Sequence, residues 1–444
     1  MKMGKKKGLV LAFFITVALG LVVGKSLAQK ASGVSEAYES LKVFTDAISL
    51  IQKNYVEKVN SKDLVYGAMK GMLEGLDPHS SFMNPDTFKE MQVETKGEFG
   101  GLGIEITMKE GVLMVVSPIE DTPAFKAGVK AGDIIIKIDG KGTKDLTLMD
   151  AVKMMRGPKG TPVIITIARD TFTEPRDFSI TRDIIAVKSV KSKPLEAGYG
   201  YVRVAQFQEK TDADLDKALD ALEKDSGGLK GLVLDLRNNP GGLLEQAVKV
   251  SDEFLESGLI VYTDGRIEGQ KMTFSAKKEG TRPNYPIVVL VNGGSASASE
   301  IVAGALQDHG RALVLGTQTF GKGSVQTIYP LEDGSALRLT TARYYTPSGR
   351  SIQAKGITPD IILESEKVKK ALPRSFREIR EKDLDGHLLV PGGKPEKEEK
   401  IEKPKEKDEK AAAPKEEEPE DVQLNRALEL LKSWQVFQKT IKKG

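Results

Sequence analysis

An alternation of buried-strand and helix patterns over residues 184–365 limits the fold of this chain most strongly. Its apolar, β-branched runs are typical of strands buried on both faces, and they lie at 201–207, 231–236, 287–292 and 312–315. Segments with helical periodicity separate these runs, at 211–224, 244–255 and 297–307. The alternation predicts an α/β domain. Since one core seldom grows beyond about 250–300 residues, a chain of 444 residues should hold further domains.

Two regions upstream differ from that domain. Residues 97–183 hold short β-type runs between turns, at 102–107, 112–116, 134–138 and 163–168, with one helical stretch at 146–155. This pattern predicts a small, β-rich, partly open sandwich. Residues 34–96 form an N-terminal helical region, in which apolar residues recur at helical spacing and a second helix is expected at 62–74. A loop should begin at Gly75.

Residues 1–28 have the pattern of a targeting signal. Four lysines precede an uncharged, apolar stretch at 8–24, and small residues follow before Gln29. A cleaved signal peptide and a retained membrane anchor both stay open, because the apolar stretch is slightly short for a spanning helix. Either way we expect the rest of the chain to be exported, to the bacterial periplasm or cell envelope, with membrane contact through this segment if it is uncleaved.

The C-terminal quarter is less informative. Residues 366–390 are a connecting segment, and 391–420 consist almost entirely of Lys, Glu, Pro and Ala. Such a composition buries too little apolar surface to fold, so we interpret 391–420 as a charged, low-complexity linker. Residues 421–444 then form an amphipathic helix. It could dock on its own domain, on a second copy in a homodimer, or on another partner.

Composition excludes several classes of protein. Lys and Arg total 66 against 63 Asp and Glu, so the net charge of +3 argues against a nucleic-acid-coating protein. Cysteine is absent, which removes disulfides, cysteine nucleophiles and cysteine-bound zinc. The three histidines, His79, His309 and His387, are too few for a histidine-rich metal site. These counts exclude cysteine-based and histidine-rich metal sites. Separately, we expect the protein's chemistry to need no metal and no cofactor.

The stretch 292–300, NGGSASASE, is the most suggestive for chemistry. A buried strand runs into a turn of small residues, and a helix follows. Backbone N–H groups at a helix start are unpaired, so they and the helix dipole could stabilise an oxyanion beside Ser297. Ser297 is thus a candidate nucleophile. Serine is also a favoured helix cap, and the residues alone leave that alternative open.

A serine nucleophile needs a base. His309 lies at the far end of the same helix, and a helix of about 12 residues spans about 18 Å. His79 stays open through long-range folding, while Lys322 stands between two glycines in FGKGSVQ. Lysine, with an ordinary pKa of about 10.4, becomes a base near neutral pH only when burial lowers that pKa to about 7–8. Gln326 could hold Lys322 if both faced one side of a strand.

Two glycine-rich turns are further candidates for binding or catalysis. The turn after the 231–236 strand, DLRNNPGG, contains Gly241 and Gly242, which could supply a second oxyanion donor, whereas we interpret Asp235 and Arg237 as structural. The other turn, Gly316–Lys322, imitates a phosphate-binding loop. Gly323 stands where that motif needs Ser or Thr, which argues against nucleotide binding.

Together these motifs resemble those of the C-terminal processing (tail-specific) serine peptidases. The matching segments run in order over residues 36–365: GLDPHS, LDLRNNPGG, SASASE, FGKGSVQ and RYYTP. The resemblance implies a Clp-protease- and crotonase-like α/β core, a Ser297 nucleophile, a Lys322 general base and Gln326 as its orienting group. It also implies oxyanion donors at the amide of Ala298 and at one amide of Gly241 or Gly242. The rival hypothesis is an exported adaptor, inactive without an activating partner.

The inserted region resembles a PDZ domain. Gly101-Leu102-Gly103-Ile104 is similar to the loop that binds a carboxylate, and AGDIIIKIDG is similar to the turn and strand that follow it in such domains. The resemblance implies that successive N–H groups bind a free C-terminus, whose chain then adds as a strand. Arg156 beyond the helix could sense that ligand, or be an ordinary solvated arginine. The expected partners are proteins with exposed apolar C-termini, and an activator.

Overall fold

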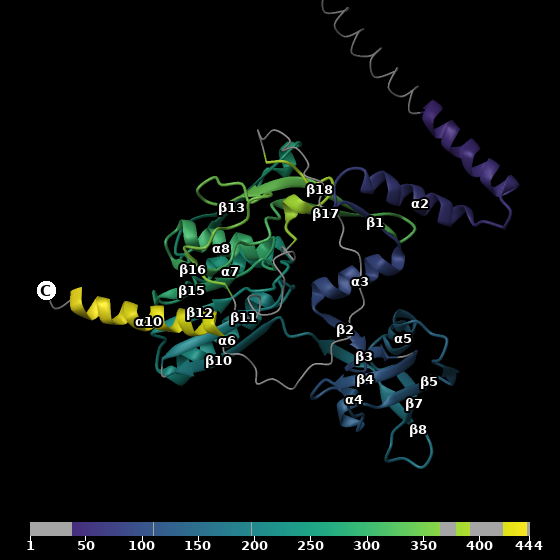
Figure 1. Cartoon of the computed structure of the whole chain (residues 1–444), viewed down its shortest axis with the longest axis horizontal. Coiled ribbons are helices and arrows are strands. Elements are labelled where there is room, and N and C mark those ends of the chain that lie inside the picture. Colours follow the sequence, from purple (N-terminus) through teal and green to yellow (C-terminus); the bar gives the residue numbers. More distant parts are fainter. Residues whose placement is uncertain (1–37, 110, 197, 365–378, 391–420, 442–444) are drawn as a thin grey trace, which may run out of the picture. The chain divides into compact units, whose positions relative to one another are not determined.

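The computed structural model describes residues 38–109, 111–196, 198–364, 379–390 and 421–441 (Figure 1). The chain divides into two compact units, Met1–Gly75 and Leu76–Gly444. The expected targeting signal and the charged linker lie outside the described residues. Among the helices of the described residues, none combines the length and apolarity needed to cross a membrane.

The described part of the first unit is helical, as expected. One helix covers residues 38–54, and α2 (Ser61–Glu74) follows. The side chain of Asn60 accepts a hydrogen bond from the N–H of Lys62, which caps α2, and Gly75 ends it. The predicted bounds of this helix are confirmed to within one residue.

The second unit begins with two short elements, β1 (Ser81–Met83) and α3 (Pro85–Lys96). The expected N-terminal helical region, residues 34–96, therefore also contains the strand β1, which is too short to show an alternating pattern in the sequence. Asn84 caps α3 by accepting from the N–H of Thr87, and Gly97 ends it with a φ of 70°.

Residues 98–186 form the predicted β-rich domain. Its elements are β2 (Glu98–Gly101), β3 (Ile104–Lys109), β4 (Val112–Pro118), α4 (Pro123–Lys126), β5 (Ile134–Ile138), β6 (Lys141–Gly142), α5 (Leu148–Met155), β7 (Pro162–Ala168), β8 (Arg176–Thr181) and β9 (Asp183–Ala186). One sheet has the order β3-β4-β5-β7-β8, with β6 on β5, and β2 pairs separately with β9. Alternate residues of β7, such as Ile165, fill its core together with Ile135 and Ile138 of β5.

The α/β domain is built on a sheet with the order β10-β11-β12-β15-β16-β19. Its strands are β10 (Val190–Glu196), β11 (Tyr199–Val204), β12 (Gly231–Asp235), β15 (Ile287–Val291), β16 (Ala312–Gly316) and β19 (Ile361–Ile362). From β11 to β19 all neighbours are parallel, whereas β10 is antiparallel. Every residue of β12 and β15 is buried, which explains their continuous apolar sequences.

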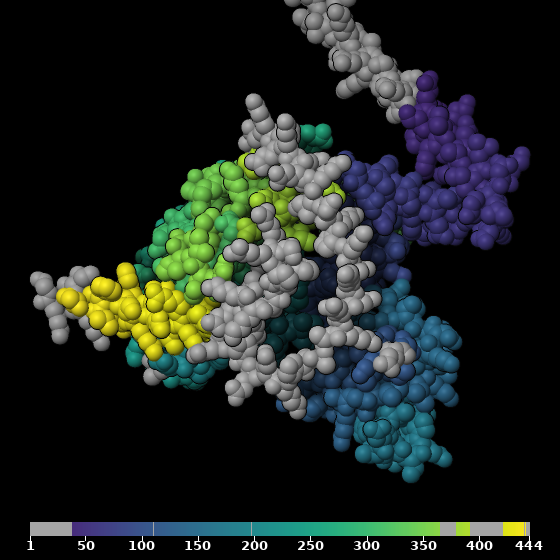
Figure 2. Space-filling model, viewed as in Figure 1, coloured from purple at the N-terminus to yellow at the C-terminus, as the bar shows by residue number. Residues whose placement is uncertain are grey.

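Helices cover both faces of this sheet. On one face Leu232 and Leu234 pack in the cluster that includes residues of α6 (Thr211–Ser226), α7 (Leu244–Asp252) and α8 (Ala298–Asp308). On the other, Val233 packs with Ala427 and Leu431 of α10 (Val422–Ile441). The C-terminal helix thus docks on its own domain, which is the first of the three docking surfaces considered from the sequence. Toward the C-terminal end of α10, the side chains of Trp434, Val436 and Phe437 are exposed, and the yellow atoms in Figure 2 extend outward there.

Ion pairs fix the start of α10. The guanidinium of Arg237 donates to both carboxylate oxygens of Asp421, at 2.9 and 2.7 Å, and to Asp235. It also donates to Gln423 Oε1 at 3.0 Å. Arg237 and Asp235 are therefore structural, as the sequence indicated, and they tie the C-terminal helix to the end of β12.

A second sheet, absent from the sequence prediction, has the order β1-β18-β13-β14, with β17 on β18. Its remaining strands are β13 (Gly258–Gly265), β14 (Thr273–Ala276), β17 (Ser324–Pro330) and β18 (Ala336–Tyr345). Two short 3-10 turns, η1 (Glu268–Gln270) and η2 (Glu381–Asp383), complete the described elements.

Candidate active site

Ser297 stands at the junction between β15 and α8. Its backbone has a φ of 54° and a ψ of −113°, a conformation that L-residues rarely adopt. Ser297 stands at the N-cap position of α8, where its N–H donates to the side chain of Glu300, but its hydroxyl makes no hydrogen bond to a helix N–H among the described residues. Strain of this kind persists only where surrounding contacts enforce it, and it is concentrated at functional sites.

The enforcing contact is Glu300, whose side chain is fully buried. One oxygen accepts from the N–H groups of Ser297 (2.8 Å) and Lys322 (3.0 Å). The other accepts from the hydroxyl of Thr319 (2.6 Å) and the N–H of Gly321 (2.7 Å). A single carboxylate thus joins the serine turn to the lysine loop, although 25 positions of sequence separate them. Sequence analysis missed this role.

Glu300 also settles the comparison with a phosphate-binding loop. The N–H groups of Gly321 and Lys322, which such a loop would direct at a phosphate, donate to this buried carboxylate instead. Burial raises the pKa of Glu300 to about 7 against the opposing effect of its donors. No group of three or more His, Asp or Glu side chains in the described ranges could hold a metal ion.

Lys322 lies in the loop before β17, with a partly buried side chain. Desolvation by burial lowers its pKa below the ordinary value, and the charge of Arg338 lowers it further. Glu381, Asp77 and Glu300 oppose that shift. The direction is the one that a lysine base requires.

The expected relation of Lys322 to Gln326 needs a correction. The expected contact requires that both residues face one side of a strand, but β17 begins only at Ser324, and its register shifts between Val325 and Gln326. A bulge of this kind interrupts the alternation of side chains. The amide of Gln326 donates to Ser324 and, at 3.4 Å, to Thr340. No bond joins it to Lys322 within the described part of the chain, so its orienting role stays a prediction.

Tyr344 lies beside both candidate catalytic residues. Its hydroxyl donates to the backbone oxygen of Lys322, and the side chain of Ser297 is close enough to oppose the rise in the pKa of Tyr344. The ring is almost completely buried, and burial raises the pKa of Tyr344 well above its usual range. Tyr344 belongs to the RYYTP motif, which signalled its position but not this contact.

The glycine turn after β12 is attached directly to the serine turn. The backbone oxygen of Asn239 accepts from the N–H of Ala296 (3.0 Å) and from the hydroxyl of Ser299 (2.9 Å). Asn238 and Asn292 exchange two further bonds, each of 2.9 Å. These bonds bring together the two turns that the sequence separates by more than fifty residues.

Gly241 touches Ser297 in that arrangement. A Cβ atom at position 241 would lie 2.8 Å from Ser297 Cβ, so only glycine fits. The N–H of Gly241 donates to Asn239 Oδ1 at 2.9 Å. In the described residues, the N–H groups of Gly242 and Ala298 have no protein acceptor. Unpaired N–H groups beside a serine can stabilise an oxyanion.

The histidines lie apart from the serine. A ring nitrogen of His309 lies 2.7 Å from the backbone oxygen of Leu259. The ring of His79 lies 2.7 Å from a carboxylate oxygen of Glu381, a fully buried residue that sequence analysis did not single out. Neither ring contacts Ser297 in the regions that the structure describes.

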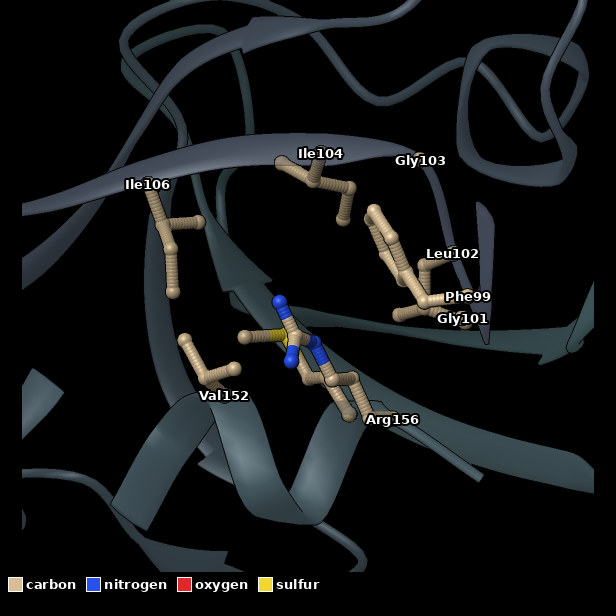
Figure 3. Close-up of a pocket in the computed structure, with 9 residues that line it drawn as sticks. Phe99, Gly101, Leu102, Gly103, Ile104, Ile106, Val152 and Arg156 are labelled. Carbon is tan, nitrogen blue, oxygen red and sulfur yellow. The ribbon is translucent and has the colours of Figure 1, made fainter. Parts of the chain in front are cut away.

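The four residues of the GLGI motif line a pocket in the β-rich domain (Figure 3). Leu102 and Gly103 lie between β2 and β3, and among the described residues their N–H groups have no protein acceptor. Apolar side chains of Ile104, Ile106 and Val152 form the walls. These features suit an extended peptide that ends in a carboxylate.

Arg156 reaches into the same pocket. Figure 3 shows its guanidinium between Val152, Ile104 and Phe99, and its Cζ lies 4.6 Å from the centre of the Phe99 ring. Arg156 is therefore not an ordinary solvated arginine. It supplies a positive charge in an otherwise apolar groove.

Comparisons with known proteins agree with this geometry. The family model "Peptidase family S41" matches residues 198–363, "PDZ domain" matches 100–180, and "Activating protease CtpB N-terminal domain" matches 20–87. A carboxy-terminal-processing protease of Bartonella bacilliformis is 48% identical over 95% of this chain and 95% of its own length. The carboxy-terminal processing protease CtpA of Bacillus subtilis is 38% identical over 80% of this chain and 74% of its own.

Among solved structures, a photosystem II D1 C-terminal processing protease is 33% identical. The match covers 74% of this chain and 93% of that one, with a TM-score of 0.43.

Proposed function

This chain belongs to the carboxy-terminal-processing serine proteases of peptidase family S41, and from that premise we propose that Ser297 and Lys322 are its catalytic dyad. The observation that supports the dyad best is the shared carboxylate of Glu300, which accepts from the backbone of both residues. The lowered pKa of Lys322 supports it independently, because a lysine base must lose its proton readily.

The proposed reaction follows from these positions. Lys322 takes the proton of the Ser297 hydroxyl as its oxygen attacks the peptide carbonyl. The developing oxyanion accepts hydrogen bonds from the N–H groups of Ala298 and Gly242, which have no acceptor within the described ranges. We favour Gly242 over Gly241, since the latter already donates to Asn239. Lys322 then protonates the leaving amine, and water hydrolyses the acyl-enzyme by the same route.

The PDZ domain is proposed to select the substrate. A free C-terminal carboxylate would accept from the N–H groups of Leu102 and Gly103, and Arg156 would add charge. The neighbouring residues would add as a strand beside β3 and place apolar side chains against Ile104 and Ile106. Substrates would then be proteins with exposed, apolar C-termini.

Export and partners complete the proposal. The basic and apolar pattern of residues 1–28 supports export to the periplasm or envelope, as a soluble or membrane-attached protein. The match of residues 20–87 to the N-terminal domain of an activating protease supports an activating partner. We also propose a homodimer as a second form of association.

Cleavage of an unfolded protein with an apolar C-terminus tests the dyad. The full chain, Ser297→Ala and Lys322→Ala are compared by mass spectrometry of the products. We expect cleavage by the wild type alone. Full activity of Lys322→Ala would show that the dyad is wrong.

The same substrate with an amidated C-terminus tests carboxylate recognition. Amidation removes one negative charge, so we expect a substantial rise in KM, on the order of 10-fold, as for the loss of a charge-assisted hydrogen bond. Arg156→Gln should weaken this preference. Equal cleavage of both substrates by the wild type would reject recognition through the carboxylate.

A further inference from the structure

The segment 379–390 contacts the loop that carries Lys322. The N–H of Glu381 donates to the backbone oxygen of Phe320 at 3.2 Å, and the side chain of Glu381 is fully buried. A buried carboxylate is costly unless it is paired. Neither the family mechanism described above nor the PDZ groove uses it.

Each carboxylate oxygen of Glu381 has its own partner. One lies 2.7 Å from the ring nitrogen Nε2 of His79, whose side chain is 14% exposed. The other accepts from the amide of Gln353 at 2.8 Å. His79 is 302 residues from Glu381 in the sequence, and Gln353 is 28 residues from it. The three side chains therefore meet only in the folded chain.

Gln353 also contacts the loop Phe320–Gly323, which carries the proposed base Lys322 and is called the base loop below. The Oε1 atom of Gln353 accepts a hydrogen bond of 3.0 Å from the N–H of Gly323, the residue that directly follows Lys322. A Cβ atom at position 323 would lie 2.3 Å from the Gln353 backbone nitrogen, so the two segments are in contact. The base loop is therefore held at Phe320 and at Gly323, on both sides of the lysine, by one buried cluster.

The charges around Lys322 show why this cluster would affect chemistry as well as folding. They are Arg338 on β18, Glu300 on α8, Asp77 before β1, and Glu381. Arg338 lowers the pKa of Lys322, while the three carboxylates raise it. His79 is the titratable group that faces Glu381 directly. The Nε of Arg338 is buried with no hydrogen-bond partner among the described residues.

We propose that Glu381, held by His79 and Gln353, is a positioning residue that fixes the Phe320–Gly323 loop and so directs Lys322 toward Ser297. Residues 379–390 then complete the active site rather than merely connecting two parts of the chain. The inference rests on the proposed role of Lys322 as the base.

The test compares variants of the full chain by kcat, KM and the pH dependence of kcat/KM, with kcat expressed per titrated active site. Glu381→Ala removes both bonds, so kcat should fall on the order of 10- to 100-fold with little change in KM. His79→Ala should change kcat in the same direction. Asp385→Asn is the matched control, an exposed carboxylate in the same segment, and should behave like the wild type.

Glu381→Gln separates charge from shape. The amide keeps an acceptor for Gln353 but loses the negative charge, so the acidic limb of the kcat/KM profile should move to lower pH. Arg338→Met should move that limb to higher pH, and Arg338→Lys should restore it. A purely structural role for Glu381 would lower thermal stability without moving either limb.

Lys322→Ala distinguishes this inference from the proposed function. If Lys322→Ala still cleaves the substrate, the dyad fails and this inference fails with it. If Lys322→Ala is inactive while Glu381→Ala and Glu381→Gln match the wild type in kcat and pH profile, only the positioning role of Glu381 is overturned.

Discussion

Gly103 in the PDZ groove shows how strictly a single position can be determined. Its φ is 78°, and a Cβ atom there would lie 2.2 Å from Thr122 Cβ. Gly140 has nearly the same φ, 77°, with open space around it. Gly140→Ala should cost about 1–2 kcal/mol from the backbone alone. Gly103→Ala should cost about 1–3 kcal/mol more, because the clash adds to it.

Denaturant unfolding and peptide binding measure this pair. We also expect Gly103→Ala to weaken binding of a peptide with a free C-terminus, whereas Gly140→Ala should leave it unchanged. Equal losses of stability in the two variants would show that the contact with Thr122 relaxes without cost.

Glu300 gives the protein a pH-dependent stability of defined sign. Burial raises its pKa to about 7, above the ordinary value of 4.5 that the unfolded chain has. Between these values the native state holds a proton that the unfolded chain has released, so the free energy of unfolding falls as pH rises through this window. Its contribution is at most about 3 kcal/mol.

Urea unfolding at pH 5 and pH 8 tests this linkage. The wild type should lose more stability between the two values than Glu300→Gln, which cannot titrate. Glu245→Gln, at an exposed position on α7, is the control. A wild-type pH dependence no steeper than that of Glu300→Gln would contradict the raised pKa.

At the scale of elements, the sequence predicted most clearly those strands whose residues are all buried. All residues of β12 and β15 are buried, so their apolar runs stood out. In β17 and β18 only some residues are buried, and long polar side chains such as Arg338 lie in the sheet, so no apolar pattern appeared. Because β17 shows no regular apolar pattern, the sequence also showed no sign of the bulge before Gln326.

In the candidate site, too, residues that belong to short local motifs were predicted, whereas contacts between distant parts of the sequence were not. Ser297 and Lys322 were found because each sits in a short motif with local chemistry. Glu300 was visible within one of those motifs, yet its four donors come from two loops. The pairing of His79 with Glu381 spans 302 positions. Neither helical nor strand periodicity encodes a contact at such a distance.

Helix α10 offers a test of docking at the element scale. Leu431 is 1% exposed and packs under the sheet, whereas Val436 on the same helix is 65% exposed. Leu431→Ala should destabilise the docked helix by about 2–5 kcal/mol, and Val436→Ala by less than about 0.5 kcal/mol. Hydrogen exchange of residues 422–441 measures both, and similar protection in the two variants would contradict docking through Leu431.

For the molecule as a whole, the described parts of the C-terminal region belong to the protease domain. Residues 379–390 contact the base loop through Glu381, and Asp421 binds Arg237 beside the oxyanion turn. Both contacts lie on loops that hold the proposed dyad and oxyanion donors. Two described segments of the C-terminal region, 379–390 and 421–441, therefore each contact a loop of the site.

This arrangement predicts which part of the C-terminal region can be exchanged. Residues 391–420 consist almost entirely of Lys, Glu, Pro and Ala, so their role should depend on length rather than sequence. Replacing them with a Gly/Ser segment of equal length should leave kcat/KM within about twofold of the wild type and the unfolding midpoint unchanged. Asp421→Asn in the same background should lower the stability of α10, because it removes the charge that pairs with Arg237. A large loss of activity on exchange of the segment alone would instead assign it a binding role of its own.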